Sequence, residues 1–468
     1  MTRIMCWNID NFNLLKIQNP QSMNLEVPYY VPEAVASTAR ENYIIGNFGF
    51  TDPVPNQLVR PDIIVVIEVS TADTFGANAG IGQLASGLGG QGAFQLLGRI
   101  RAVTGNASWM LVPPLQTGPQ EAVAVYYDSS NYCFVGPWFW PGGNGPSRNA
   151  AAPADYPQPF RDGLPDTDIP AGLPNAGVSE RKVAAATGFT YRVGHAQAGQ
   201  PINYAANVRT PYWVKLAEVN YGQNPPVVGR TFSLFAIHGP AGNALALGYL
   251  TGLADVAEIV AAPAVNEVKV VLGDFNLNLT VEQAPPPVIV QAPAYAGLTA
   301  AGYTLAFSSP GQVPSGNANF TGYRGYLATH VRTLGNATYW YIGNNSDFYP
   351  GFGYVGSDTA TRNYSLDNIL VRFGLDGHGA PCGILANATV LNGVVSSPFA
   401  AYVPPHNAPQ GTYGWPLQMG TVADYNAPPQ QIMGPNDPND ARRASFPQWD
   451  NFGHIRCTSD HMAIVASV

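Results

Sequence analysis

Carboxylate and amide side chains follow directly after the apolar run at residues 269–272. Asp274 and Asn276 stand behind Gly273, and because strand side chains alternate, the two are expected to point the same way. A carboxylate beside an amide at a rigid strand end suits a metal-assisted attack on phosphate: the anion polarises water or binds a cation, and the amide donates to a phosphoryl oxygen. The same Gly-Asp-Phe-Asn stretch can instead form an Asx turn that carries no chemistry.

A second carboxylate, Glu68, lies near the end of the strongest strand pattern, residues 63–69. Aliphatic residues precede it, so burial of its charge is costly unless the carboxylate is paired or bound to a cation. A metal ligand explains this placement, and so does a solvated strand end. Asn8 and Asp10 lie at the exit of a short strand at 4–8, where a turn rich in Asn and Asp is the alternative.

Two of the seven histidines, His238 and His461, stand at the edges of strong strand patterns, whereas the others lie in loop-like context. An isolated histidine at a strand end is usually structural. Here, however, polar residues recur at strand ends along the whole chain. The set comprises Asn8, Glu68, Glu121, Arg209, His238, Asp274, Asn276, Asp367, Asp460 and His461.

The elements that must position these side chains are predicted from apolar runs and from β-branched residues. Strands are expected at residues 4–8, 63–69, 120–128, 209–216, 231–238, 269–272, 365–372 and 459–465, and helices at 33–47, 91–103 and 245–260. The run Gly87-Leu88-Gly89-Gly90-Gln91-Gly92 has the spacing GxGxxG. It comes well after the preceding strand, so we do not interpret it as a dinucleotide site.

Length and composition limit the possible domain organisation and the possible binding partners, but they do not identify a function. The 468 residues contain no repeat and no clean linker, which favours one domain spanning 1–468 with loop-rich insertions near 136–203, 280–364 and 376–455. Only 11% of the residues are charged and the formal net charge is −8. Such a surface has no bulk attraction for nucleic acid, so any binding of DNA or RNA requires a local site and bound cations.

The first residues enter a strand pattern directly, without the features of a cleaved secretory signal. No apolar run is long enough to span a bilayer. We therefore expect a soluble chain that is cytoplasmic, or exported without a cleaved signal peptide. The four cysteines are scattered singly and are interpreted as structural or free thiols.

The ordered motifs resemble the endonuclease/exonuclease/phosphatase superfamily, within it the branch of deoxyribonuclease I and the cytolethal distending toxin nuclease subunit. The segments that carry the resemblance are Trp7-Asn8-Ile9, Ile67-Glu68-Val69, Ile237-His238-Gly239-Pro240, Gly273-Asp274-Phe275-Asn276, Ser365-Leu366-Asp367 and Ser459-Asp460-His461. Gln120-Glu121 and Arg209-Thr210-Pro211 resemble features of the deoxyribonuclease I branch. Each motif is weak alone, and their shared order is specific. The resemblance covers the core strands but not the three insertions.

This resemblance implies an α/β fold, a four-layer α-β-β-α sandwich of two packed, mainly antiparallel sheets with long loop insertions. It implies that Glu68, Asp460 and Asn8 hold a divalent cation, Mg²⁺ or another such as Mn²⁺ or Ca²⁺.

The resemblance also assigns roles to the remaining residues. Glu121 would orient His238, and Asp367 would orient His461. Asp274 and Asn276 would position the nucleophile and the phosphate. Arg209 would grip a phosphate oxygen.

The expected function is metal-dependent hydrolysis of phosphodiester bonds, with DNA as the first substrate and the protein acting as an endonuclease. The branch carries a basic residue at the position of Asp10, so either the substrate approaches differently or it is not duplex DNA. The alternatives are a phospholipid phosphodiesterase similar to sphingomyelinases, a phosphatase, and a non-catalytic binding protein that kept the fold. The insertions offer a surface for a protein partner.

Overall fold

Two six-stranded β-sheets form the centre of the protein. The computed structural model describes residues 1–18, 44, 60–71, 85, 87–118, 120–136, 165–181, 209–241, 243–277, 280–281, 288–289, 293–307, 330–331, 341–342, 347–348, 363–364, 366–391, 459, 461 and 463–468. Most of the predicted helix at 33–47 and much of the three predicted insertions lie outside these residues.

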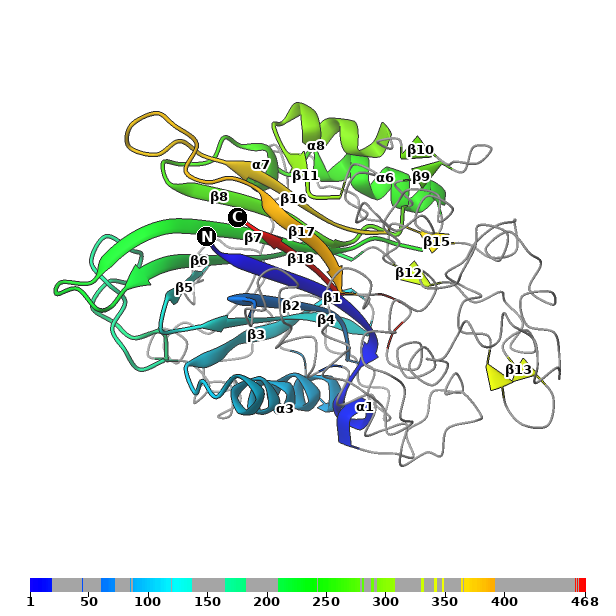
Figure 1. The fold of residues 1–468 in the computed structure, drawn as a ribbon, viewed down its shortest axis with the longest axis horizontal. Coiled ribbons are helices and arrows are strands. Elements are labelled where there is room, and N and C mark those ends of the chain that lie inside the picture. The colour runs from blue at the N-terminus through cyan, green and yellow to red at the C-terminus, as the bar shows by residue number, and fades with distance from the viewer. Residues whose placement is uncertain are drawn as a thin grey trace, which may run out of the picture.

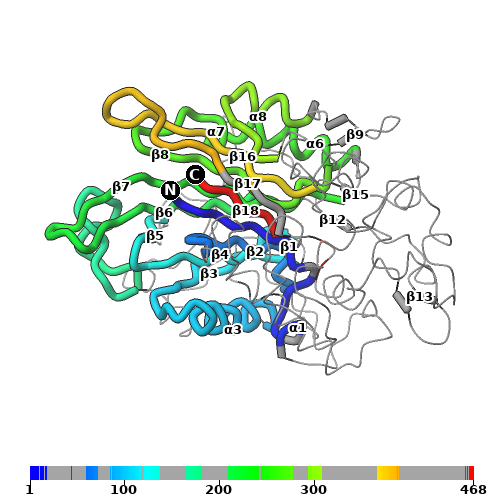
Figure 2. Tube along the Cα trace, in the orientation of Figure 1, coloured from blue at the N-terminus to red at the C-terminus, as the bar shows by residue number. Residues whose placement is uncertain are grey.

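The first sheet has the strand order β17-β18-β1-β2-β4-β3. Its strands are β1 (Arg3–Phe12), β2 (Ile63–Ser70), β3 (Trp109–Gly118), β4 (Glu121–Asp128), β17 (Ala386–Leu391) and β18 (Ala463–Ser467). Only β1 and β2 are parallel, and every other neighbouring pair in this sheet is antiparallel. The two ends of the chain meet in it, because β1 lies beside β18 (Figure 2).

The second sheet has the order β11-β16-β8-β7-β6-β5. Its strands are β5 (Tyr132–Gly136), β6 (Tyr212–Asn220), β7 (Val227–His238), β8 (Glu267–Asp274), β11 (Thr304–Leu305) and β16 (Asp367–Phe373). Here β7 and β8 form the one parallel pair. Two-residue strands pair elsewhere: β9 (Thr280–Val281) with β10 (Val288–Ile289), β12 (His330–Val331) with β15 (Asn363–Tyr364), and β13 (Tyr341–Ile342) with β14 (Asp347–Phe348).

Helices cover the outer faces of both sheets (Figure 1). On the side of the first sheet lie α1 (Leu14–Gln18) and α3 (Gly87–Thr104), and on the side of the second lie α6 (Asn243–Leu253), α7 (Ala257–Val260), the short 3₁₀ helix η2 (Pro293–Tyr295) and α8 (Ala296–Ala300). The layers follow the order helix, sheet, sheet, helix, which confirms the predicted four-layer α-β-β-α sandwich. No helix among the described residues is long and apolar enough to cross a membrane.

The core lies between the sheets and under the helices. β8 is buried along its whole length, and residues 63–67 of β2 are fully buried. Both strands therefore carry apolar side chains on both faces, as strands covered on two sides do. Burying one such aliphatic side chain stabilises the fold by roughly 1.5–3 kcal/mol. These buried strands form a rigid base for the polar residues at their ends.

The glycine-rich run at 87–92 forms the first turns of α3. A Cβ atom on Gly89 would lie 1.9 Å from the carbonyl oxygen of Ser70, and one on Gly92 would lie 2.5 Å from the backbone of Asn13 and Leu14. The helix can approach the end of β2 this closely only without side chains at these positions. Close packing therefore explains these two glycines.

The main sheets take strands from ranges that the sequence suggested as insertions. β17 lies within 376–455 and pairs with β18, and β11 lies within 280–364 and pairs with β16. The sequence pattern also missed β3, because Pro113 and Pro114 interrupt it. The ladder between β3 and β4 shifts register between Val112 and Leu115, which accommodates residues that cannot donate a backbone hydrogen bond.

Candidate active site

Strand direction brings the predicted polar residues to one edge of the sandwich. The parallel pair of the first sheet delivers Asn8 and Glu68 near the ends of β1 and β2, and the parallel pair of the second sheet ends in His238 and Asp274. The antiparallel neighbours begin where these strands end, so β4 opens with Glu121. β16 likewise opens with Asp367.

His238 lies among three carboxylates. Its Nδ1 atom is 2.9 Å from Glu121 Oε2, and its Nε2 atom is 3.1 Å from Glu68 Oε1 and 3.3 Å from Asp274 Oδ2. Burial alone would lower the pKa of this histidine, but the charges of Glu121 and Glu68 outweigh burial and raise the pKa to about 10. The surrounding carboxylates therefore favour the protonated, charged form of the imidazole.

His461 approaches the same aspartate from the other side. Its Nδ1 atom is 2.8 Å from Asp367 Oδ2, and its Nε2 atom is 3.5 Å from Asp274 Oδ2. Burial raises the pKa of Asp274, but His461 and His238 outweigh it and hold that pKa well below its usual value. Asp274 is thus a buried anion between two imidazoles.

Backbone groups of the C-terminal segment attach His461 to β1. Trp7 Nε1 donates to the carbonyl of His461 at 3.0 Å, and the hydroxyl of Ser459 donates to the carbonyl of Asn8 at 2.7 Å. Ser459 also accepts the backbone N–H of His461 at 2.9 Å. Neither the Ser459 hydroxyl nor the Trp7 ring has a role predicted from the sequence. The only signal was their position beside Asn8 and His461.

Glu68 has a left-handed backbone conformation, with φ of 60°. The ladders on both sides of β2 shift register around it, between Asn8 and Phe12 of β1 and between Val66 and Val69 of β2 itself. A non-glycine residue in this conformation is strained, and such strain is concentrated at functional sites. The bulge directs the carboxylate toward His238, which strand alternation alone did not predict.

Asn276 and Arg209 meet at the carbonyl of Gly239. Asn276 Nδ2 donates to this oxygen at 2.7 Å and to Asp274 Oδ2 at 3.1 Å, and Arg209 Nη1 donates to the same carbonyl at 2.8 Å. Arg209 also forms an ion pair through Nε with Glu121. Its side chain is 23% exposed, so Arg209 is not fully enclosed by these partners.

Gly273 permits this arrangement. Its φ of +146° lies in the region that glycine favours, and a Cβ atom there would be 2.0 Å from the carbonyl oxygen of Ile237. The close approach of β7 and β8 places His238 directly beside Asp274 in the parallel register. Asp367 faces Asp274 on the opposite side. His238, Asp274 and Asp367 therefore form a row across three neighbouring strands.

The residues present fit a hard divalent cation. Four carboxylates, Glu68, Glu121, Asp274 and Asp367, lie around one guanidinium and two imidazoles. Ligand atoms of Glu68, Glu121 and His238 lie within 4.8 Å of one another, as do those of Asp274, Asp367 and His461. Each group contains a hydrogen-bonded carboxylate–histidine pair, so an ion bound by either whole group would displace that pair.

A different set of oxygen ligands avoids that displacement. Asn8 is 1% exposed, and its Oδ1 atom has no hydrogen-bond partner among the described residues. A buried carbonyl oxygen without a partner is costly, and a cation is one group that would satisfy it. Asn8 and Glu68 are two of the three predicted ligands. The third, Asp460, and the side chain of Asp10 lie outside the described residues.

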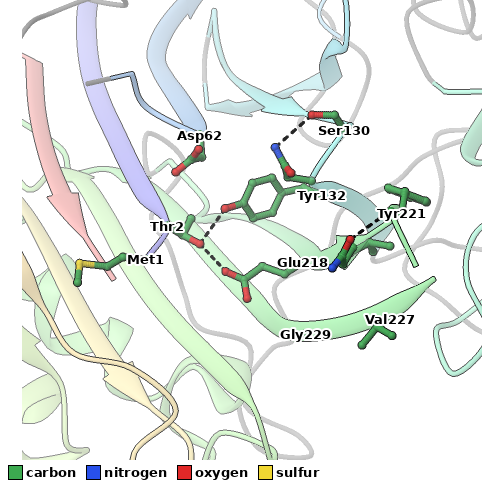
Figure 3. A pocket seen from close by; sticks show the side chains of 13 residues that line it. Met1, Thr2, Asp62, Ser130, Tyr132, Glu218, Tyr221, Val227 and Gly229 are labelled. Carbon is green, nitrogen blue, oxygen red and sulfur yellow. Dashed lines mark hydrogen bonds between the residues drawn. The ribbon is translucent and has the colours of Figure 1, made fainter. Parts of the chain in front are cut away.

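A separate pocket of about 480 Å³ lies at the opposite end of β1 (Figure 3). Thr2, Asp62, Tyr132 and Glu218 are among its lining residues, and the Thr2 hydroxyl binds both Tyr132 and Glu218. Because Thr2 directly precedes β1, and Asn8 lies toward the other end of that strand, this pocket is distinct from the candidate active site.

Comparisons with known proteins give fold-level likeness only. No family model and no curated protein sequence matches the chain. Among solved structures, TDP2 from D. rerio aligns over 99% of this chain and 97% of its own, at 9% identity and a TM-score of 0.35. The catalytic domain of human Nocturnin covers 99% and 93%, at 12% identity and a TM-score of 0.29.

A mannosyl-6-phosphatase from Bacteroides thetaiotaomicron covers 84% of this chain and 90% of its own, at 10% identity and a TM-score of 0.32. These three proteins have the deoxyribonuclease I-like fold. Alignments with TM-scores this low carry no argument about activity. In its layers, in its strand-end motifs and in the carboxylate–histidine pairs, the chain resembles the endonuclease/exonuclease/phosphatase superfamily.

Proposed function

We propose that the protein is a metal-dependent phosphodiesterase that cleaves DNA as an endonuclease. The observation that carries this proposal is the convergence of two imidazoles on one carboxylate. The Nε2 atoms of His238 and His461 lie 3.3 and 3.5 Å from Asp274 Oδ2, while a separate carboxylate holds each Nδ1 atom. Two groups that can carry a proton and one anion would therefore lie within hydrogen-bonding reach of a single bound phosphate.

Hydrolysis of a phosphodiester needs water to attack phosphorus, the bond to the leaving oxygen to break, and a proton to reach that oxygen. Asp274 is a buried anion that accepts a hydrogen bond from an attacking water and orients it. The Nε2 atom of one histidine accepts the proton that the attacking water loses, and the Nε2 atom of the other gives a proton to the leaving oxygen. Glu121 and Asp367 fix the orientation of the imidazole rings.

Asn8, Glu68 and Asp460 would hold the divalent cation. When bound, the cation supplies charge stabilisation for the phosphoryl oxygens. Among the residues of the chain itself, Asn276 is a further donor at the site, because its amide lies between Asp274 and the carbonyl of Gly239. The exposed part of Arg209 is placed to contact a phosphate that enters beside Glu121.

DNA is the proposed substrate because Arg209 offers a further phosphate contact beside Glu121 and His238, next to the residues that would carry out the hydrolysis. A polynucleotide carries further phosphates beside the scissile one, and a guanidinium can hold one of them through two hydrogen bonds. The acidic net charge of −8 means that binding depends on this local site and on cations.

The test is incubation of the purified full chain with supercoiled plasmid and Mg²⁺, with and without a chelator. The proposal expects nicked and linear plasmid that disappear with the chelator. Ser233→Ala serves as the control variant, because this buried serine binds Glu267 and lies outside the site. His461→Ala should abolish nicking, while Ser233→Ala should retain it.

Two results would overturn the proposal. Undiminished nicking by His461→Ala would assign the activity to a contaminant. If the plasmid stays intact over the same range of Mg²⁺ concentration while sphingomyelin in mixed micelles is hydrolysed, the substrate is a phospholipid and not DNA. Failure on both substrates and on a small aryl phosphodiester would reject the phosphodiesterase assignment.

A further inference from the structure

His461 lies beyond the regular register between β1 and β18. The paired residues of this register run from Arg3 with Ser467 to Cys6 with Ile464. His461 lies three residues beyond the last of these partners along the chain. His461 itself takes part in a β-bridge, so side-chain bonds act together with backbone pairing in fixing the position of the imidazole.

Two side chains add hydrogen bonds that hold this segment. The indole of Trp7 donates to the carbonyl of His461 at 3.0 Å. The hydroxyl of Ser459 donates to the carbonyl of Asn8 at 2.7 Å and accepts the backbone N–H of His461 at 2.9 Å. Both polar groups of the His461 backbone are thus tied to β1, one directly through Trp7 and one through Ser459.

Burial makes the serine hydroxyl hard to replace. Ser459 is 1% exposed and His461 is 5% exposed, so bulk water does not reach these bonds. Without the hydroxyl, the N–H of His461 and the carbonyl of Asn8 would each lose this buried hydrogen bond. The segment would then relax, while Asp274 and Asp367 stay fixed in β8 and β16.

We infer that Ser459 is a positioning residue for the reaction: its hydroxyl sets the His461 imidazole between Asp367 and Asp274 by fastening the backbone of His461 to β1. This inference rests on the proposed function for its effect on turnover. Its physical basis is geometric, because Nε2 of His461 is 3.5 Å from Asp274 Oδ2 and a small shift changes that separation. Misplacement of a reacting group by a fraction of an ångström is enough to slow catalysis.

Kinetics of four variants test the inference: Ser459→Ala, His461→Ala, the double mutant and Ser233→Ala. Ser233 is the matched control, since it is also 1% exposed and loses one side-chain hydrogen bond when truncated. We expect Ser459→Ala to lower kcat by about 10–100-fold with little change in KM, as the loss of an orienting partner does. Ser233→Ala should leave both parameters unchanged.

The double mutant separates positioning from a general loss of structure. If Ser459 acts through His461, removing it from a chain that already lacks the imidazole costs nothing further in kcat. The double mutant should therefore match His461→Ala. A further tenfold loss in the double mutant, or a kcat for Ser459→Ala equal to that of Ser233→Ala, would overturn the inference.

Proton NMR provides a readout that needs no activity. The Nδ1 protons of His238 and His461 are hydrogen-bonded to buried carboxylates, so both should resonate far downfield, each assigned by its loss in the matching alanine variant. Ser459→Ala should shift or broaden the His461 signal and leave that of His238 in place. An unchanged His461 signal sinks the inference. Lack of hydrolysis by the wild type rejects the proposed function alone, because the NMR result still decides the role of Ser459.

Discussion

Asp367 lies directly opposite Asp274 in the antiparallel pair of β16 and β8. Like charges at facing positions of a sheet destabilise it. His461 offsets this repulsion, since Nδ1 binds Asp367 and Nε2 faces Asp274. The imidazole is therefore a structural bridge between two buried carboxylates as well as a candidate for proton transfer. A variant that lacks this imidazole is therefore expected to lose both the bridge between the carboxylates and the candidate proton-transfer group.

Replacement of either histidine by alanine should lower kcat by several orders of magnitude. The double variant His238→Ala/His461→Ala should cost far less than the product of the two single effects, because groups that act on one reaction as a unit are strongly non-additive. Steady-state kinetics on plasmid and on a small phosphodiester check this. A single variant with a near wild-type rate would remove that histidine from the site.

Glu68→Gln should lose most hydrolysis at physiological Mg²⁺ while the fold stays intact. The amide keeps the shape of the side chain but removes the charge that a cation would neutralise. The measurement is activity against Mg²⁺ concentration, with circular dichroism to verify folding. Glu218→Gln is the control, because Glu218 pairs with Arg230 away from the site. Full activity of the wild type in excess chelator contradicts the prediction.

Arg209→Ala should impair plasmid nicking more than cleavage of a minimal aryl phosphodiester. The guanidinium also binds Glu121, the partner of His238, so some loss is expected on both substrates. The difference between the substrates measures the contact with DNA. Losing one phosphate contact should reduce the slope of the logarithm of the DNA-binding constant against the logarithm of the salt concentration by about one unit. Equal losses on the two substrates would mean that Arg209 acts only through Glu121.

Glu180 should make the protein less stable as the pH rises toward neutral. Its carboxyl group is buried, accepts the backbone N–H of Phe134 at 2.8 Å and binds the Tyr127 hydroxyl. Burial outweighs these hydrogen bonds and raises its pKa from 4.5 to about 7. Between these values the folded state holds a proton that the unfolded state has lost. The contribution of Glu180 to the free energy of unfolding is therefore fully present below about pH 4.5 and is lost as the pH rises through 7. The total change is on the order of 3 kcal/mol.

Urea unfolding of Glu180→Gln between about pH 5 and 7.5 tests this, because a neutral amide removes the proton linkage. Its free energy of unfolding should vary less with pH than that of the wild type. Glu218→Gln is the matched control, since the pKa of Glu218 is lowered and its window lies on the acid side. Equal pH dependence in the wild type and in Glu180→Gln would contradict the assignment.

The sequence by itself determined where polar residues end strands. Asn8, Glu68, His238 and Asp274 each follow an apolar run, and that pattern is local, because strands covered on both faces are mostly apolar along their length. The order of such strand ends resembles that of the endonuclease/exonuclease/phosphatase superfamily, and that resemblance implied the four-layer sandwich. The order was also enough to single out the residues that the structure brings to one edge.

Only the tertiary structure decided the contacts between distant segments. The bond from Ser459 to Asn8 joins residues 451 positions apart, and no periodicity records it. β17 pairs with β18 although its range reads as loop, because an edge strand needs only one partner and little apolar sequence. The left-handed backbone of Glu68 likewise follows from a bulge between neighbouring strands. Such features arise because buried polar groups must find partners in three dimensions, and the identity of those partners depends on the packing of the whole chain.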